Sequence, residues 1–112
     1  MRSGDRSKYG AKKVQVDGYI FDSKMEARRY GELRLIEKAG KICGLAVHPK
    51  FSITIQGKPI CIVELDFCYA HLSGTEIYED VKGFDTAISK LKRKLVEAAY
   101  GFKVTVIRKE TR

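Results

Sequence analysis

Three runs of β-branched and aromatic residues, all within residues 51–82, constrain the fold more than any other feature of the sequence. The turn signal Gln56–Pro59 separates KFSITIQ from PICIVELDFCY, and Ser73-Gly74 separates the second run from EIYEDVKG. Short connections of this kind join antiparallel strands, because a parallel pair needs a long crossover. The segment therefore predicts a three-stranded antiparallel meander whose second strand extends toward His71.

A hairpin and a helix are expected before the meander. VQV and YIF flank an Asp17-Gly18 turn signal, which is typical of a two-residue β-hairpin. The following segment is rich in helix formers, so we expect a helix that begins at Asp22 or Ser23 and continues to about Ala39.

A second helix and a last strand are expected after the meander. Within residues 85–100, apolar side chains recur at helical spacing and predict the buried stripe: Ile88, Leu91, Leu95 and Ala98. Gly101 ends this run, and FKVTVIR then alternates as a strand. A strand, a helix and a strand in succession favour a parallel crossover.

These elements predict a single α/β domain over residues 1–112, since a chain of this length can bury one core but not two. The expected architecture is a central mixed β-sheet flanked by two helices, in the order α, β, β, β, α, β after an N-terminal hairpin. We expect residues 1–13 to form a mobile basic arm.

The formal charge of +8 and the pI of about 9.5 favour a polyanionic partner, above all nucleic acid. The candidate contacts for a nucleic-acid backbone are the basic residues of the arm and of the second helix: Lys12, Lys13, Lys90, Lys92, Arg93 and Lys94. A solvated helix face explains the last four equally well.

The spacing of the cysteines and the hydropathy of the chain indicate where in the cell the protein is located. Cys43, Cys61 and Cys68 are odd in number and show no CxxC spacing, so we expect neither a disulfide framework nor a zinc site. No apolar run is long enough to span a bilayer, and the N-terminus is polar. We therefore expect a cytoplasmic protein with no membrane partner.

Asp80 and Lys82 lie two residues apart on the third predicted strand, so both side chains point to one face, while Glu79 points to the other. A hairpin that turns about Ser73 places Asp66 opposite Asp80 on that same face. Facing carboxylates need a compensating cation. Either Mg²⁺, which prefers oxygen ligands, supplies that charge, or Lys82 does so in a simple cross-strand ion pair.

Glu26 lies on the same face of the first helix as Tyr30 and Leu33, so its carboxylate is expected to point inward. The SKME sequence is also a capping box, in which Ser23 and Glu26 would satisfy each other's backbone amides. Glu26 therefore has two candidate roles, as a third acidic ligand of a metal ion or as part of the helix cap.

The set formed by Glu26, Asp66 and Asp80-Val81-Lys82, in that element order, resembles the PD-(D/E)XK nuclease superfamily, whose core has a restriction-endonuclease-like fold. FDSKMEARRY, ELDFCY, YEDVKG and KLKRKLVEAAYG are similar to a family of small phage-encoded proteins placed in that superfamily. The sequence departs from the superfamily pattern at Leu65, where a proline often precedes the aspartate.

The resemblance implies that Asp66 and Asp80 bind the metal, that Lys82 is the catalytic lysine and that Glu26 is the helix acid of resolvase-like members. Glu79 is the rival of Asp80, but only Asp80 shares a face with Lys82. Glu64 is either an outer group of the site or an exposed strand carboxylate. Neither histidine, His48 nor His71, is assigned a role.

The implied activity is that of a DNA endonuclease that depends on Mg²⁺, with Mn²⁺ able to substitute, in the cytoplasm of a phage's bacterial host. We expect a homodimer, because a chain this small needs two copies to cut two strands. Branched or four-way junction DNA is the substrate that this resemblance favours. A non-catalytic nucleic-acid-binding protein that retains the fold is the alternative.

Overall fold

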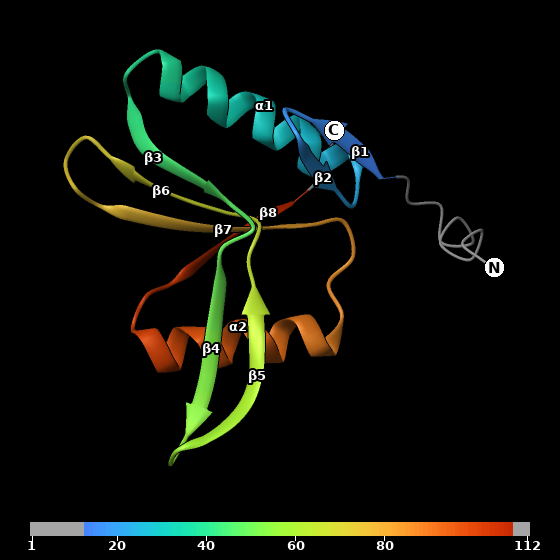
Figure 1. Cartoon of the computed structure of the whole chain (residues 1–112), viewed down its shortest axis with the longest axis vertical. Coiled ribbons are helices and arrows are strands. Elements are labelled where there is room, and N and C mark those ends of the chain that lie inside the picture. Colours follow the sequence, from blue (N-terminus) through green and yellow to red (C-terminus); the bar gives the residue numbers. More distant parts are fainter. Residues whose placement is uncertain (1–12, 109–112) are drawn as a thin grey trace.

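The computed structural model of the protein describes residues 13–108, which form two helices and eight strands (Figure 1). In chain order the elements are β1 (Val14–Val16), β2 (Tyr19–Phe21), α1 (Lys24–Lys38), β3 (Ile42–Val47), β4 (Lys50–Ile55), β5 (Lys58–Glu64), β6 (Phe67–His71), β7 (Glu76–Lys82), α2 (Ala87–Tyr100) and β8 (Val104–Arg108). The α/β class, the N-terminal hairpin and both helices are confirmed. The expected arm lies outside the described residues, except for Lys13.

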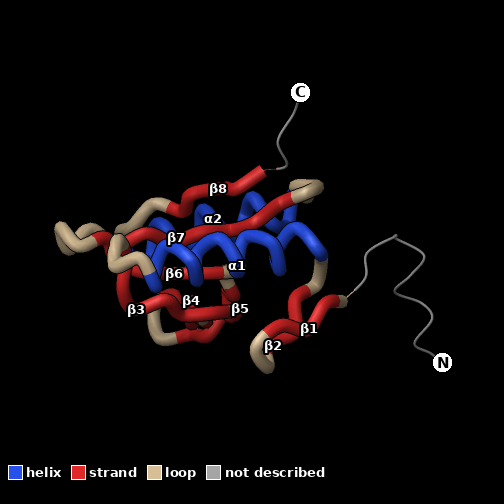
Figure 2. The backbone as a smooth tube through the Cα atoms, turned by 90° about the horizontal axis from the view of Figure 1, so that it is seen from above, coloured by secondary structure: helices blue, strands red, loops and turns tan. Residues whose placement is uncertain are grey.

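The central sheet has four strands in the order β3-β6-β7-β8, and Figure 2 shows these strands side by side, with β8 at the top. β6 is antiparallel to both β3 and β7, whereas β8 runs parallel to β7. The sheet is therefore mixed, and α2 provides the predicted crossover between its two parallel strands.

The predicted meander is wrong in one respect, because β4 and β5 form a separate two-stranded sheet that projects from the body of the molecule (Figure 1). The chain leaves the central sheet at two adjacent bends, one at His48-Pro49 and one at Leu65-Asp66. The His48 amide donates to the Asp66 carbonyl at 2.9 Å, and the Leu65 amide donates to the Pro49 carbonyl at 3.0 Å.

These hydrogen bonds hold the two bends together. If β3 and β4 are counted as one bent strand, and β5 and β6 as another, the order of elements is the predicted one. The strand β3 itself was not predicted, because a positive φ of 67° at Gly44 and a register shift between Cys43 and Ala46 interrupt the alternation on which a prediction depends.

One hydrophobic core lies between α1 and one face of the central sheet. Its buried members are Phe21, Tyr30, Leu33, Ile42, Phe67, Tyr69 and Val81. Tyr30 and Leu33 come from α1, as the spacing of apolar residues predicts. The β1–β2 hairpin packs against α1 and contributes the fully buried ring of Phe21.

A second core lies on the other side of β7, where α2 packs against β4 and β5. It is formed by Ile53, Val63, Leu65 and Val96, with Tyr78 of β7 partly buried against them. β7 therefore separates the two cores, because its successive side chains point alternately toward α1 and toward the α2 side.

The predicted buried stripe of α2 is wrong for most of its members. Ile88 and Leu91 are 61% and 53% exposed, Ala98 is exposed, and only Leu95 is partly buried. The face that packs inward carries Val96, which is fully buried, and Arg93, which forms ion pairs with Asp85 and Asp80. The inward face of the helix is therefore not its most apolar stripe. Neither of the two helices in the described part of the chain is long and apolar enough to cross a membrane.

Candidate metal centre

The first part of the site is built by the register between β6 and β7. Phe67 pairs with Glu79, which is the register that a turn about Ser73 predicts, so Asp66 lies one step further along, beside Asp80. β6 begins only at Phe67, so the Val81 amide has no partner strand on that side. It donates instead to Oδ2 of Asp66 at 2.6 Å. The bend in the chain thus fixes the Asp66 carboxylate against β7.

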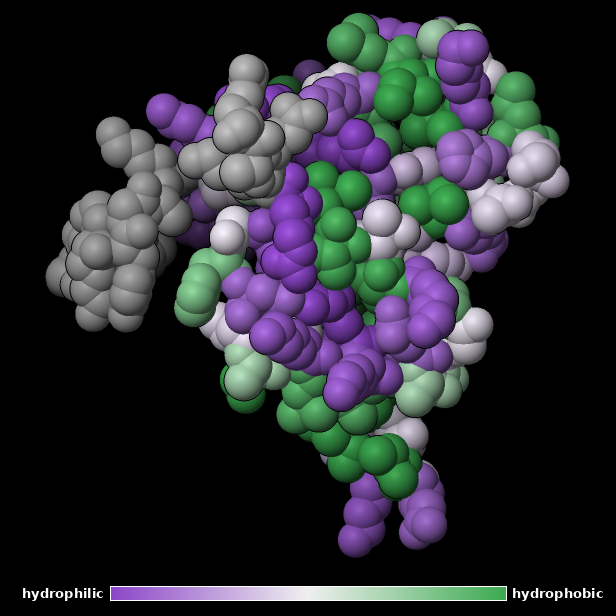
Figure 3. All heavy atoms as spheres, turned by 180° about the vertical axis from the view of Figure 1, so that it is seen from behind, coloured by the Kyte–Doolittle hydropathy of each residue, from purple (hydrophilic) through white to green (hydrophobic). Residues whose placement is uncertain are grey.

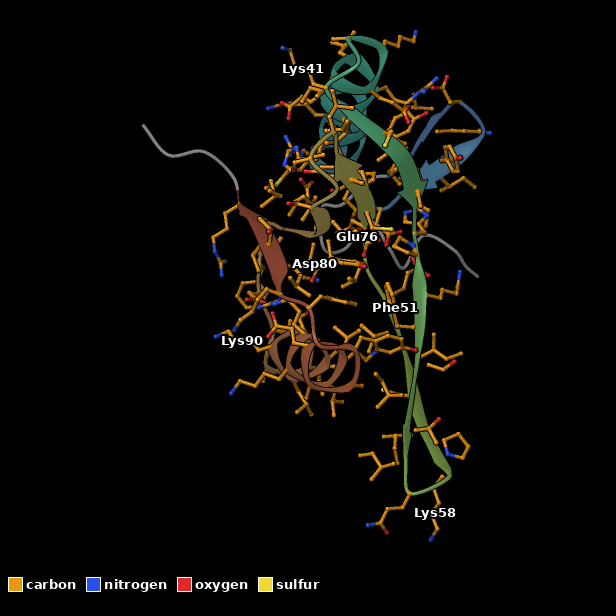
Figure 4. The ribbon with its side chains drawn as sticks, turned by 90° about the vertical axis from the view of Figure 1, so that its left-hand side faces the viewer. Lys41, Phe51, Lys58, Glu76, Asp80 and Lys90 are labelled. Atoms are coloured by element: carbon orange, nitrogen blue, oxygen red, sulfur yellow. The ribbon has the colours of Figure 1, made fainter. Side chains whose placement is uncertain are left out.

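Asp80 points to the α2 side of β7 and is only 6% exposed. Its Oδ2 lies 3.5 Å from Nζ of Lys82 on the same strand and 3.5 Å from Nη1 of Arg93 on α2. Figure 4 shows Asp80 in the middle of the molecule, above α2. The carboxylate and the ammonium thus share a face, as their spacing predicts.

Glu26 is brought to the same place by the first turn of α1. Its amide donates to Oγ of the N-cap residue Ser23 at 3.1 Å, which is one half of the predicted capping box. The other half is different, because Oε1 of Glu26 lies 3.4 Å from the Asp22 amide rather than accepting from Ser23. An oxygen of the Glu26 carboxyl group lies within 4.8 Å of one of Asp66.

The clustered carboxyl groups perturb one another. Burial, the charge of Glu26 and the neighbouring Asp80 raise the pKa of Asp66 to about 8, against the lowering effect of the Val81 amide. Burial and the charge of Asp22 also raise the pKa of Glu26, although the charge of Lys82 opposes this rise. Burial and neighbouring carboxylates thus disfavour the ionised forms of these groups, and a bound metal ion would favour them.

Glu79 lies on the opposite face of β7, so it is not a member of this cluster. Its carboxylate is 1% exposed and accepts two hydrogen bonds from Arg29 of α1, at 2.8 and 2.6 Å, and one from the Tyr69 hydroxyl. Parity along β7 thus separates the two adjacent acids: Asp80 faces Lys82, and Glu79 ties the strand to α1.

Glu64 is about half exposed and lies 3.4 Å from Nζ of Lys50 on β4. This placement agrees with an exposed strand carboxylate, the second of the two roles expected for it.

The basic residues expected to contact nucleic acid have different surroundings. Lys90, Lys92 and Lys94 are exposed on α2, whereas Nζ of Lys13 pairs with Asp22 at 2.8 Å. Lys12 lies outside the described residues. The prediction for Arg93 needs correction, because its guanidinium donates to both Asp85 oxygens, at 2.9 and 2.5 Å, and its side chain is 12% exposed. Arg93 therefore fixes α2 against β7.

Residues 6–111 match the model of a protein family that is described as a protein of unknown function, DUF1064. The chain belongs to the DUF1064 family. Neither the curated proteins nor the solved structures include a match to it. The family description assigns no activity, so the chemistry of this DUF1064 protein is inferred from its own residues.

The residue that sequence reasoning missed in this DUF1064 protein is His48. One nitrogen of its ring and one oxygen each of Glu26 and Asp66 all lie within 4.8 Å of one another. The signal in the sequence is weak, because a histidine before Pro49 is typical of a loop. Only the adjacent bends of the two long strands bring it to the cluster.

The donor set fits a divalent metal ion. The carboxylate oxygens of Glu26 and Asp66, which lie together with His48, are hard ligands of the kind that Mg²⁺ and Mn²⁺ take, and Asp80 lies beside Asp66. Burial is the main cause of the raised pKa values of Glu26 and Asp66, and the charge of Glu26 adds to the rise at Asp66. The residues that the DUF1064 sequence predicted for a metal are thus near neighbours in space.

Proposed function

We propose that this DUF1064 protein is a metal-dependent DNA endonuclease that hydrolyses phosphodiester bonds. The observation that carries the proposal is the convergence of Glu26, Asp66, Asp80 and Lys82 from α1, the β5–β6 bend and β7. The three elements that carry these residues are far apart in the sequence, and clusters of titratable groups with shifted pKa values are typical of functional sites.

In this proposal Glu26, Asp66 and Asp80 bind Mg²⁺, or Mn²⁺ in its place. The bound ion would polarise the phosphoryl oxygen and lower the pKa of an attacking water. Lys82 would orient that water or stabilise the negative charge that develops on the phosphate. Its ammonium is held beside Asp80 and keeps 22% of the side chain exposed, so a substrate can reach it. Arg93 would hold Asp80 in position from the α2 side.

The charge of the molecule supports DNA as the substrate. The chain carries a formal charge of +8, and three lysines of α2 are exposed on the side of β7 to which Asp80 points. Seen from behind, hydrophilic side chains form a band across the middle of the molecule (Figure 3). The resemblance to resolvase-like nucleases adds branched or four-way junction DNA as the substrate and the cytoplasm of a bacterial phage host as the location. The small size of the chain adds a homodimer as the active form, because two strands are to be cut.

The proposal is tested with the variants Asp80→Asn and Lys82→Ala and with supercoiled, linear and four-way junction DNA. Each variant should abolish cleavage in Mg²⁺ and leave DNA binding within about threefold of the parent, because these groups act mainly on the transition state. Lys58→Ala is the matched control, since it removes one positive charge at the far tip of the β4–β5 hairpin (Figure 4).

Cleavage by either site variant at the parental rate would contradict the assignment of the site. A parent protein that binds DNA but does not cut it in Mg²⁺ or Mn²⁺ would point instead to a non-catalytic nucleic-acid-binding protein.

A further inference from the structure

We infer that His48 is a nitrogen ligand of the metal centre, together with Glu26 and Asp66, and that the centre therefore prefers Mn²⁺ to Mg²⁺. The inference rests on the proposed metal site and specifies its ligands. It changes the expected oxygen-only site into one with a single imidazole.

The backbone at the first bend places the His48 ring. Its φ of 57° is in the left-handed region, and its amide donates to the Asp66 carbonyl at 2.9 Å. The imidazole packs against the fully buried ring of Phe21, with 5.5 Å between ring centroids. Backbone and ring contacts therefore hold His48 beside the Asp66 carboxylate before any ion binds.

The three donors come from three different parts of the chain. Glu26 belongs to the first turn of α1, His48 to the β3–β4 bend, and Asp66 to the β5–β6 bend. Their ligand atoms lie within 4.8 Å of one another, so the side chains need to move only a little to bind one ion between them. Three protein ligands with further positions left open are typical of a catalytic metal site.

Asp80 is oriented differently from these three donors. Its Oδ2 lies between the ammonium of Lys82 and the guanidinium of Arg93, at 3.5 Å from each. With its negative charge balanced in this way, Asp80 is less available as a ligand than sequence reasoning expects. In this arrangement the ring nitrogen of His48 takes the third position at the ion, and Asp80 lies next to it.

The ligand set determines which ion is preferred. Mg²⁺ is a hard ion that keeps oxygen ligands and its own waters, whereas imidazole suits ions of the transition series. One nitrogen and two carboxylates therefore favour Mn²⁺ over Mg²⁺. A plain hydrogen bond from the imidazole to a carboxylate is the competing explanation, and it requires no ion.

Pulsed electron paramagnetic resonance of Mn²⁺ bound to the metal-free, full-length parent distinguishes the two explanations. A directly bound imidazole gives hyperfine coupling between Mn²⁺ and its ring nitrogen. The chain has two histidines, so His71→Asn is the matched control and should retain the coupling. His48→Asn should lose it, and asparagine tolerates the left-handed backbone at this position better than most residues.

Calorimetric titration of the same proteins gives the second readout. Mn²⁺ affinity should fall about tenfold or more in His48→Asn and stay unchanged in His71→Asn, while Mg²⁺ affinity changes by less than about threefold. Thermal melting of each variant without metal checks that it is folded. If His48→Asn does not fold, the spectra of the parent and of His71→Asn decide the question by themselves.

A parent complex with Mn²⁺ that shows no nitrogen coupling, or a parent that binds no Mn²⁺, would overturn the inference. Its failure can be told from that of the proposed function, because cleavage is measured separately. A parent protein that cuts DNA but shows no nitrogen coupling would contradict only the assignment of His48 as a ligand. A parent protein whose Mn²⁺ is coupled to nitrogen but that cuts no DNA would contradict only the proposed nuclease activity.

Discussion

At the scale of single residues, Glu79 and Asp80 show how one step along a strand changes a carboxylate's role. Asp80 faces Lys82 and Arg93, and Glu79 faces Arg29 and Tyr69 on the other side of β7. Both carboxylates are buried, so each needs its partners to offset the cost of desolvation. The first set of partners includes Lys82, whose side chain is partly exposed, and the second ties α1 to the sheet.

Glu79→Gln should therefore destabilise the protein by about 3 kcal/mol, because it leaves Arg29 without its buried charge partner. Urea unfolding at neutral pH measures the change. Glu76→Gln on the same strand is the control, since Glu76 is exposed and should cost less than about 0.5 kcal/mol. The Glu79 variant should still cut DNA at temperatures where it is folded. Equal stabilities of the two variants would show that the Arg29 contact contributes little.

The lowered pKa of Asp85 predicts how the stability of the protein depends on pH. Its hydrogen bonds with Arg93 and the charges of Arg93 and Arg108 lower its pKa from 3.8 to about 2. A lowered pKa means that the folded state favours the ionised carboxylate, so this stabilisation is present above about pH 4 and is lost as the pH falls toward 2. Asp85→Asn should be less stable than the parent at pH 7, and the difference should fade between pH 4 and pH 2. Denaturant unfolding at a series of pH values tests this, and a difference that does not vary with pH would contradict it.

At the scale of elements, α2 shows that the most apolar stripe of a helix is not always the buried one. The helix has Thr86 as its N-cap, and Gly101 ends it with a φ of 79°, as its sequence predicts. Arg93 lies on its inward face, where it forms ion pairs with Asp85 and Asp80. Val96 is consequently buried, and Leu91 is exposed.

Val96→Ala should cost about 2 kcal/mol, because it removes buried methyl groups and leaves a cavity in the second core. Leu91→Ala removes a larger side chain from the same helix and should cost less than about 0.5 kcal/mol, since that side chain is 53% exposed. Thermal or urea unfolding compares the two variants. A larger loss for Leu91→Ala would mean that the stripe predicted by periodicity is buried in solution.

At the scale of the whole molecule, two bends divide a pair of long strands between two cores. β3 and β6 remain in the central sheet with α1, while β4 and β5 pack against α2 (Figure 1). The candidate site lies where the strands separate, because the second bend frees the Val81 amide and places Asp66 beside β7. The same two bends therefore divide the strands between the cores and bring the residues of the candidate site together.

Binding of DNA should weaken steeply with salt, because the exposed lysines displace counterions from phosphates. If Lys90 contacts one phosphate, Lys90→Gln should reduce the slope of log K against log salt concentration by about 1. Lys41→Gln, at the opposite end of the molecule (Figure 4), is the control and should leave the slope unchanged. Fluorescence anisotropy with a labelled duplex measures both. An affinity of the parent that does not vary with salt would argue against a nucleic-acid partner.

Much of the fold and of the site could be predicted from local patterns in the sequence. The Asp17-Gly18 turn and the Ser23 cap were predicted because both depend on backbone geometry within a few residues. The same is true of the Ser73-Gly74 turn, which sets the register of β6 and β7 and so places Asp66 beside Asp80. Strand parity then puts Lys82 on the face of Asp80 and Glu79 on the other.

Only the tertiary structure decided the features that depend on contacts between distant segments. The bend at His48 is held by hydrogen bonds to residues 65 and 66, so nothing in its own neighbourhood reveals that it lies beside Glu26 and Asp66. The inward face of α2 carries Arg93, whose partner Asp80 lies on β7, so the spacing of apolar residues within the helix does not reveal this face. A sequence pattern records what a residue prefers locally, whereas its partners across the fold are chosen by how the elements pack together.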